Sequence, residues 1–156
     1  MANYILEIED EIDFELIAIR SILPDYQLAY VLNKQLKIQL GRSRKDLDVQ
    51  FKRKGEIFHF TYFEYYDEKD FKEFQLIKNY SFEEIVAVAQ HTNYLFEEIQ
   101  ESKPYLLKEL KGFDFIIKQR GFEQAELLEI IKKIKPVQYA LNIDVNTIKS
   151  INYINF

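Results

Sequence analysis

The chain has 156 residues, 47% hydrophobic and 30% charged, which excludes a disordered or fibrous protein and predicts one compact domain over residues 1–156. Cysteine is absent, so thiol nucleophiles, thiolate metal sites and disulfide bonds are excluded. The first ten residues are acidic and no apolar run reaches the roughly 20 residues that span a bilayer, so we expect a soluble cytoplasmic protein without membrane contact.

The N-terminal region contains two predicted elements. Apolar and polar residues alternate over residues 3–8, which is typical of a half-buried strand. Residues 14–23 repeat apolar side chains at spacings of three and four, which suits a helix with Asp13 as its N-cap. A strand over residues 14–19 is the alternative, because so short an apolar run fits both structures. The sequence leaves this choice open.

A helix is predicted over residues 25–36. Pro24 and Asp25 stand at its start, where a helix tolerates proline and favours an acid. Its rings and aliphatic side chains, among them Tyr26 and Tyr30, fall on neighbouring turns. A short strand at residues 38–40 is expected to follow.

A β-hairpin is the clearest supersecondary prediction. Residues 56–66 and 71–80 are rich in strand-forming side chains, and the polar tetrapeptide 67–70 has the length that joins antiparallel neighbours. In the first strand Phe58 and Phe60 point to one face, while Phe63 and Tyr65 point to the other. Rings on both faces indicate a central strand that is covered on both sides.

The second half of the chain alternates between helical and strand patterns. The expected elements are a helix over 80–90 capped by Ser81, a strand over 113–118, a helix over 122–135 that ends before Pro136, a strand over 137–143 and a turn capped by Asp144. Residues 92–98 are ambiguous. Together these elements predict an α+β fold, in which a mostly antiparallel sheet contains a central β-hairpin and helices pack against it.

Residues 107–115, L-K-E-L-K-G-F-D-F, resemble the signature of the IPExxxVDY family, a group of small bacterial proteins of unassigned function. Glu109 and Asp114 fall on its two acidic positions at the correct spacing. The apolar positions are replaced by other apolar residues, and Lys108 departs from the proline. Residues 14–19 and 25–33 also look like that family. The resemblance implies a single domain and supplies no activity.

The two motif acids have a structural interpretation. Glu109 stands near a predicted helix end, and Asp114 interrupts an apolar strand. An acid in such a strand must face solvent or be paired, so we interpret Asp114 as lying on the wet face or accepting main-chain N–H bonds after Gly112. Reactive use is the alternative.

Catalytic and metal-binding patterns are sparse. His59 and His91 are isolated, and neither stands in a metal-binding spacing. Glu7, Glu9 and Glu11 share one strand face and would offer oxygens to Mg²⁺ or Ca²⁺, but no calcium-loop motif supports that reading. Glycine-rich phosphate loops and nucleophile elbows are missing from the sequence. We therefore expect no cofactor and no bound metal, and a small enzyme with carboxylate acid/base chemistry is the second alternative.

A basic segment precedes the aromatic strand. Cations that follow phosphates, next to rings that stack on bases, are how single-stranded nucleic acid is held. The net charge of −5 and two acids within the segment, Asp46 and Asp48, disfavour that partner. The candidate contact residues in residues 42–54 are Arg42, Arg44, Lys45, Lys52, Arg53 and Lys54.

Abundant aromatic side chains and little catalytic equipment favour binding over catalysis. Interfaces between proteins are enriched in Tyr, Phe and Arg. We expect a non-enzymatic accessory or regulatory protein that binds a protein partner, as a monomer or as a homodimer through a sheet edge. Binding of single-stranded RNA is the first alternative.

Overall fold

The computed structural model describes residues 12–51, 57–81 and 104–156. Its main sheet has six strands in the order β2-β5-β6-β7-β1-β8, and every neighbouring pair is antiparallel. The strands are β1 (Glu15–Ser21), β2 (Gly41–Arg42), β5 (Tyr62–Asp67), β6 (Lys72–Lys78), β7 (Phe115–Arg120) and β8 (Val137–Ile143). A second sheet pairs β3 (Leu47–Gln50) with β4 (Ile57–Phe60). The predictions for residues 3–8, 82–90 and 92–98 lie outside the described residues.

The region for which the sequence left helix and strand open forms strand β1. It lies between β7 and β8, so both of its edges are hydrogen-bonded to neighbouring strands. Ile17 and Ile19 are buried on one face, Leu16 and Ala18 on the other. A run of apolar residues that is buried on all sides fits a central strand as well as a helix. Pairing with β7 and β8 makes this segment a strand. The helix over residues 14–23 is therefore wrong, and the strand is confirmed.

The predicted hairpin is present as β5 and β6, with Phe63 opposite Leu76. Its first strand is shorter than predicted, because the chain leaves strand geometry at Thr61. The Thr61 hydroxyl donates to Asp25, and its main-chain oxygen accepts from Lys78. Residues 57–60 consequently belong to the second sheet, where β4 pairs with β3.

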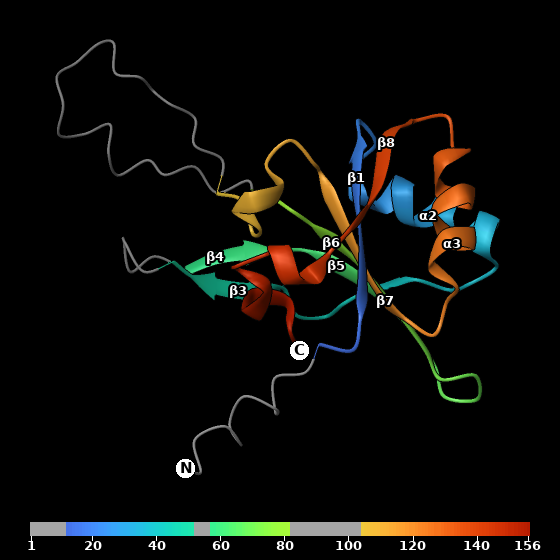
Figure 1. The fold of residues 1–156 in the computed structure, drawn as a ribbon, viewed down its shortest axis with the longest axis horizontal. Helices are drawn as coiled ribbons and strands as arrows, with labels where there is room; N and C mark the ends of the chain where they lie inside the picture. The colour runs from blue at the N-terminus through green and yellow to red at the C-terminus, as the bar shows by residue number, and fades with distance from the viewer. Residues whose placement is uncertain (1–11, 52–56, 82–103) are drawn as a thin grey trace, which may run out of the picture.

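Two helices, α2 (Asp25–Leu36) and α3 (Gln124–Lys132), cover the same face of the main sheet (Figure 1). The bounds of α2 are those predicted, and its end is marked by Lys37 in the left-handed conformation (φ 56°). α3 begins after Glu123, whose side chain accepts the Glu126 N–H. Side chains from both helices share one apolar cluster with the sheet, including Leu28, Leu32, Leu127, Ile131, Phe74 and Ile117.

The strand expected at residues 38–40 is wrong, since the paired residues are those of β2, directly after it. Leu40 is instead held by the side chain of Asn33, which accepts its N–H at 2.7 Å and donates to its oxygen at 3.3 Å. A side-chain contact from the end of α2 thus replaces strand pairing here.

The opposite face of the main sheet is covered by the β3–β4 sheet and by short 3₁₀ turns (Figure 1). The turns are Lys108–Leu110, Val145–Thr147 and Ile151–Ile154. Asp144 caps the second turn by accepting the Asn146 N–H, as predicted. The fold is therefore α+β, with helices on one face of a mostly antiparallel sheet and a small hairpin sheet on the other. None of the described helices is both long and apolar enough to cross a membrane.

Candidate functional site

A row of large apolar side chains lies exposed along α2 and the loop before it. Ile22 is 81% exposed, Tyr26 61% and Tyr30 59%. The two tyrosines are four residues apart, so they are neighbours on one helix face. Lys34 continues this row one turn further, with its Nζ 4.8 Å from the centre of the Tyr30 ring. We call Ile22, Tyr26 and Tyr30 the α2 surface.

The α2 surface borders an open depression of about 680 Å³, which Ile22 and Tyr26 help to line. The depression lies at one end of three neighbouring strands. Strands β1 and β6 end there, and β7 begins there. Its charged and phenolic lining consists of Arg20, Asp25, Tyr26, Lys78, Tyr80 and Asp114. Sequence segments that are far apart therefore bring polar groups to one place.

Asp114, one of the two motif acids, is held by the main chain. Its Oδ2 accepts the Ser21 N–H at 2.9 Å, and the Ser21 hydroxyl donates to the Pro136 oxygen at 3.0 Å. The interpretation of Asp114 as an acceptor of main-chain N–H bonds is confirmed, but the donor lies at the end of β1 and not in the turn after Gly112. The Asp114 carboxylate thus joins the start of β7 to the end of β1 within the lining of the depression.

Tyr80 lines this depression with its phenol ring. Burial raises its pKa above the usual value, and the negative charges of Asp114 and Asp25 and the neighbouring Tyr105 contribute to the rise. Lys78 places its Nζ 4.8 Å from the centre of the Tyr80 ring. The Tyr80 phenol is therefore protonated at neutral pH.

Glu109, the other motif acid, lines neither this depression nor the one described next. Its carboxylate accepts hydrogen bonds from the Ser150 N–H at 3.0 Å and from the Ser150 hydroxyl. Burial alone would raise the pKa of Glu109, but the hydrogen bonds from Ser150, together with main-chain hydrogen bonds of Glu109 and Lys149, outweigh it and lower the pKa. Glu109 therefore joins two 3₁₀ turns and does not meet Asp114 in a common site.

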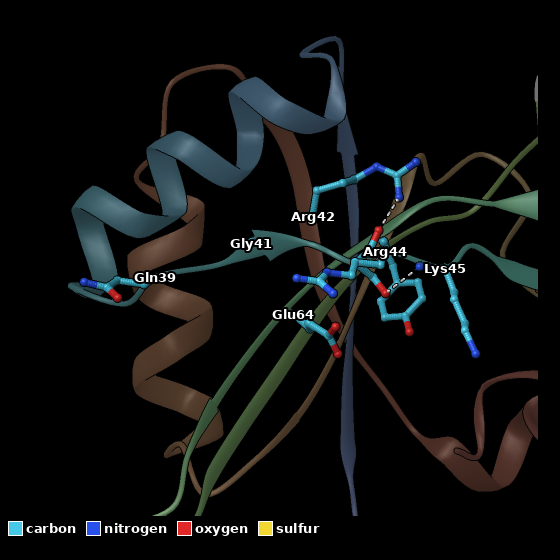
Figure 2. Close-up of a pocket in the computed structure, with 8 residues that line it drawn as sticks. Gln39, Gly41, Arg42, Arg44, Lys45 and Glu64 are labelled. Atoms are coloured by element: carbon cyan, nitrogen blue, oxygen red, sulfur yellow. Dashed lines mark hydrogen bonds between the residues drawn. The ribbon is translucent and has the colours of Figure 1, made fainter.

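Three residues of the basic segment, Arg42, Arg44 and Lys45, line a second open depression of about 490 Å³ together with Tyr62 and Glu64 (Figure 2). The guanidinium of Arg42 lies 3.0 Å from an Asp46 carboxylate oxygen and donates to the Ser43 oxygen. Charge is thus partly neutralised within the depression. Lys52, Arg53 and Lys54 lie outside the described residues.

His59 lies on the small sheet, away from both depressions. It is exposed on β4 and pairs with Asp48 directly across the small sheet. Between residues 12 and 156, outside the two internal gaps, no group of three or more His, Asp or Glu side chains could hold a metal ion. His91, Glu7, Glu9 and Glu11 are not described.

The α2 surface was missed at the sequence level, although a signal existed. Ile22, Tyr26, Tyr30 and Lys34 follow one another at intervals of four residues. Only the buried face, on Leu28 and Leu32, packs against the sheet, so the remaining rings face outward. A helix with apolar side chains on opposite faces therefore indicates a contact surface on the face that does not pack against the sheet.

Comparisons with protein-family models, curated proteins and solved structures found no match for this chain. The resemblance to the IPExxxVDY family thus stays a prediction that depends on residues 14–19, 25–33 and 107–115.

Proposed function

We propose that the protein acts by binding another protein through the α2 surface, as a non-enzymatic accessory or regulatory protein. The supporting observation is the exposure of Ile22, Tyr26 and Tyr30 in one row beside a depression. Soluble monomers rarely expose contiguous patches of large apolar side chains, and tyrosine is enriched where proteins bind.

The charges around the α2 surface define the chemistry of the partner. Asp25 is engaged by the Tyr26 N–H at 2.8 Å and by the Thr61 hydroxyl at 3.0 Å, and Asp114 is engaged by Ser21. Arg20 is exposed at the rim of the depression. We therefore propose a partner segment whose apolar side chains cover the two tyrosines and whose acidic side chain reaches Arg20.

The test compares three baits in affinity capture from the native cell. The wild type is expected to capture a partner that the Tyr26→Ser/Tyr30→Ser variant recovers at least about tenfold less, as expected for the loss of interface anchors. Tyr66→Ser/Phe71→Ser, which removes exposed rings at the hairpin turn, is the matched control and should recover as much as the wild type.

Arg20→Glu then probes the acidic side chain of the partner. It should weaken capture, and an Asp/Glu→Lys change in the identified partner segment should restore it. Equal recovery by the wild type and the Tyr26→Ser/Tyr30→Ser variant, or no partner specific to the wild type, would contradict the proposal.

A second candidate function is binding of single-stranded RNA at the basic depression. It is favoured by the presence of Arg42, Arg44 and Lys45 beside the Tyr62 ring, and Asp46 and Glu64 weigh against it. Affinity for a fluorescent oligouridine should fall steeply with salt and in Arg44→Glu/Lys45→Glu. Absence of binding at low salt would exclude this function.

A further inference from the structure

A buried amide oxygen on β6 has no hydrogen-bond partner. Gln75 is 5% exposed, and its Nε2 donates to a Glu73 carboxylate oxygen at 2.8 Å. That contact identifies the nitrogen end of the amide and leaves Oε1 as an acceptor. Among the buried side-chain nitrogens and oxygens of residues 12–51, 57–81 and 104–156, Gln75 Oε1 is the one without a partner. An unsatisfied buried acceptor costs about 1–3 kcal/mol, so the fold gains whenever a donor reaches this oxygen.

Lys118 of β7 is placed to be that donor. It lies directly opposite Gln75 in the β6–β7 register, which runs without a shift over six residue pairs. Both side chains point to the face that carries the β3–β4 sheet, because Ile77 and Ile116 lie two residues away on the same strands and pack there. Opposite side chains of an antiparallel pair have Cβ atoms about 4.5–5.5 Å apart, a distance that a lysine side chain can span. An ammonium has three N–H groups, so Lys118 can serve more than one acceptor.

Phe156 covers the Lys118 ammonium. Its main-chain oxygen accepts from the Lys118 Nζ at 2.6 Å, and the centre of its ring lies 4.1 Å from the same atom. The Phe156 ring also contacts Tyr62, with 5.6 Å between the ring centres. Phe156 is nevertheless 47% exposed, whereas Lys118 is fully buried. A half-exposed residue thus covers a buried cation through contacts that a phenylalanine of another chain could also make.

We propose that Phe156 is a detachable cover over a binding site for an aromatic side chain of a partner. When Phe156 leaves, the Lys118 Nζ donates to Gln75 Oε1, so detachment exchanges one hydrogen bond for another and leaves no unpaired buried charge. The ammonium and Tyr62 then recognise an aromatic ring through a cation–π contact and a ring–ring contact, as they recognise Phe156. The proposal does not depend on the proposed function, because it uses no residue of the α2 surface.

Acetylation of Lys118 measures how often the cover opens, because a buried amine reacts with acetic anhydride only while it is accessible. The full chain receives a brief pulse of the reagent, and peptide mass spectrometry compares Lys118 with the exposed Lys149 of the same molecules. Phe156→Gly removes the covering ring and should raise the relative acetylation of Lys118 at least about tenfold. Equal acetylation of this variant and the wild type would show that Phe156 is no cover.

A free aromatic compound tests whether the vacated place is a binding site. N-acetyl-L-phenylalaninamide, added in large excess to Phe156→Gly, should fill that place and lower the acetylation of Lys118 at least about threefold. N-acetyl-L-alaninamide has no ring and is the control, so it should give no protection. Equal effects of the two compounds would overturn the binding site.

Gln75→Met tests the second acceptor. The variant offers no oxygen to Lys118, so the cover should open less often and the acetylation of Lys118 should fall at least about threefold below the wild type. Gln35→Met, at an exposed position on α2, is the matched control and should match the wild type. Low urea concentrations should not change the acetylation, since a local opening exposes little surface. Acetylation that rises with urea as global unfolding does, or equal acetylation of Gln75→Met and the wild type, would overturn the exchange of acceptors.

Discussion

The two faces of the main sheet are closed in different ways. On one face, α2 and α3 pack an apolar cluster that includes Phe74, Leu76 and Ile117. On the other face, short segments from three separate parts of the chain close the sheet: the β3–β4 sheet, the turn at Lys108–Leu110 and the C-terminal 3₁₀ turns. Two amphipathic helices cover the first face, whereas the second face accommodates the fully buried cation of a lysine.

That cation is Lys118 of β7, which is fully buried. Its Nζ donates to the Phe156 main-chain oxygen at 2.6 Å and lies 4.8 Å and 4.1 Å from the ring centres of Phe14 and Phe156. Burial, with a smaller contribution from the positive charge of Arg120, lowers the pKa of Lys118 to about 8. Arg120 itself is paired with Asp13 and Glu73. The second face therefore carries the desolvation cost of a fully buried charge.

The sharpest contrast between the faces is expected for truncated rings. Phe74 is fully buried on the helical face, 5.5 Å from the Phe122 ring, and Phe74→Ala should lower the free energy of unfolding by about 3–5 kcal/mol. Phe60 is equally buried on the other face, but the two-stranded sheet above it can move inward to fill the cavity. Phe60→Ala should therefore cost less. Urea unfolding of both variants measures the difference, and a larger loss for Phe60→Ala would refute this contrast.

A buried amide anchors the segment that closes the second face. Asn79 donates through Nδ2 to the Leu110 and Phe113 oxygens, each at 3.1 Å, and its Oδ1 accepts the Leu107 N–H at 2.9 Å. Asn79→Ala leaves three main-chain groups without this partner, so we expect a loss of about 2–4 kcal/mol in urea unfolding. Asn155→Ala, at an exposed position, is the control. An equally small loss for both variants would show that water replaces the amide.

The helical face was largely predictable from the sequence and the other face was not. The apolar periods of residues 25–36 and 122–135 are local and predict both helices, although α3 ends at Lys132 and not just before Pro136. Other features of the fold depend on contacts between distant segments. These are the turn of the chain at Thr61, the pairing of β3 with β4 and the hydrogen bonds between Asn79 and residues 107–113. Ser21 as donor to Asp114 is 93 residues away, so no local pattern could identify it.

Removal of the buried charge should stabilise the protein. Lys118→Met keeps an unbranched side chain and removes only the terminal ammonium position, and replacing a buried charge by an apolar group is often neutral or favourable by about 1–4 kcal/mol. The pKa of Lys118 is lower in the folded state than its ordinary value of 10.5, so the cost of the charge is complete below about pH 8. As the pH rises from about 8 to 10.5, folded Lys118 is neutral and the wild type approaches the variant in stability.

Urea unfolding of Lys118→Met and the wild type at several pH values measures this convergence. Lys149→Met, at an exposed position, is the control and should show no such pH dependence. A variant less stable than the wild type at pH 7 would mean that the hydrogen bond to Phe156 outweighs the desolvation of the charge.

The smallest effect is expected for Glu109, which ties two of the closing segments together. Glu109→Gln should lower the free energy of unfolding by no more than about 1 kcal/mol at neutral pH, because its hydrogen bonds to Ser150 are solvent-exposed. The pKa of Glu109 is lower in the folded state, so the difference from the wild type should be present above the ordinary pKa of glutamate and vanish as the pH falls through the folded value. Acid titration of stability measures it, with Glu68→Gln in the hairpin turn as the control. If Glu109→Gln matches Glu68→Gln at every pH, the link between the turns adds nothing, and the second face is closed by its apolar contacts and Asn79.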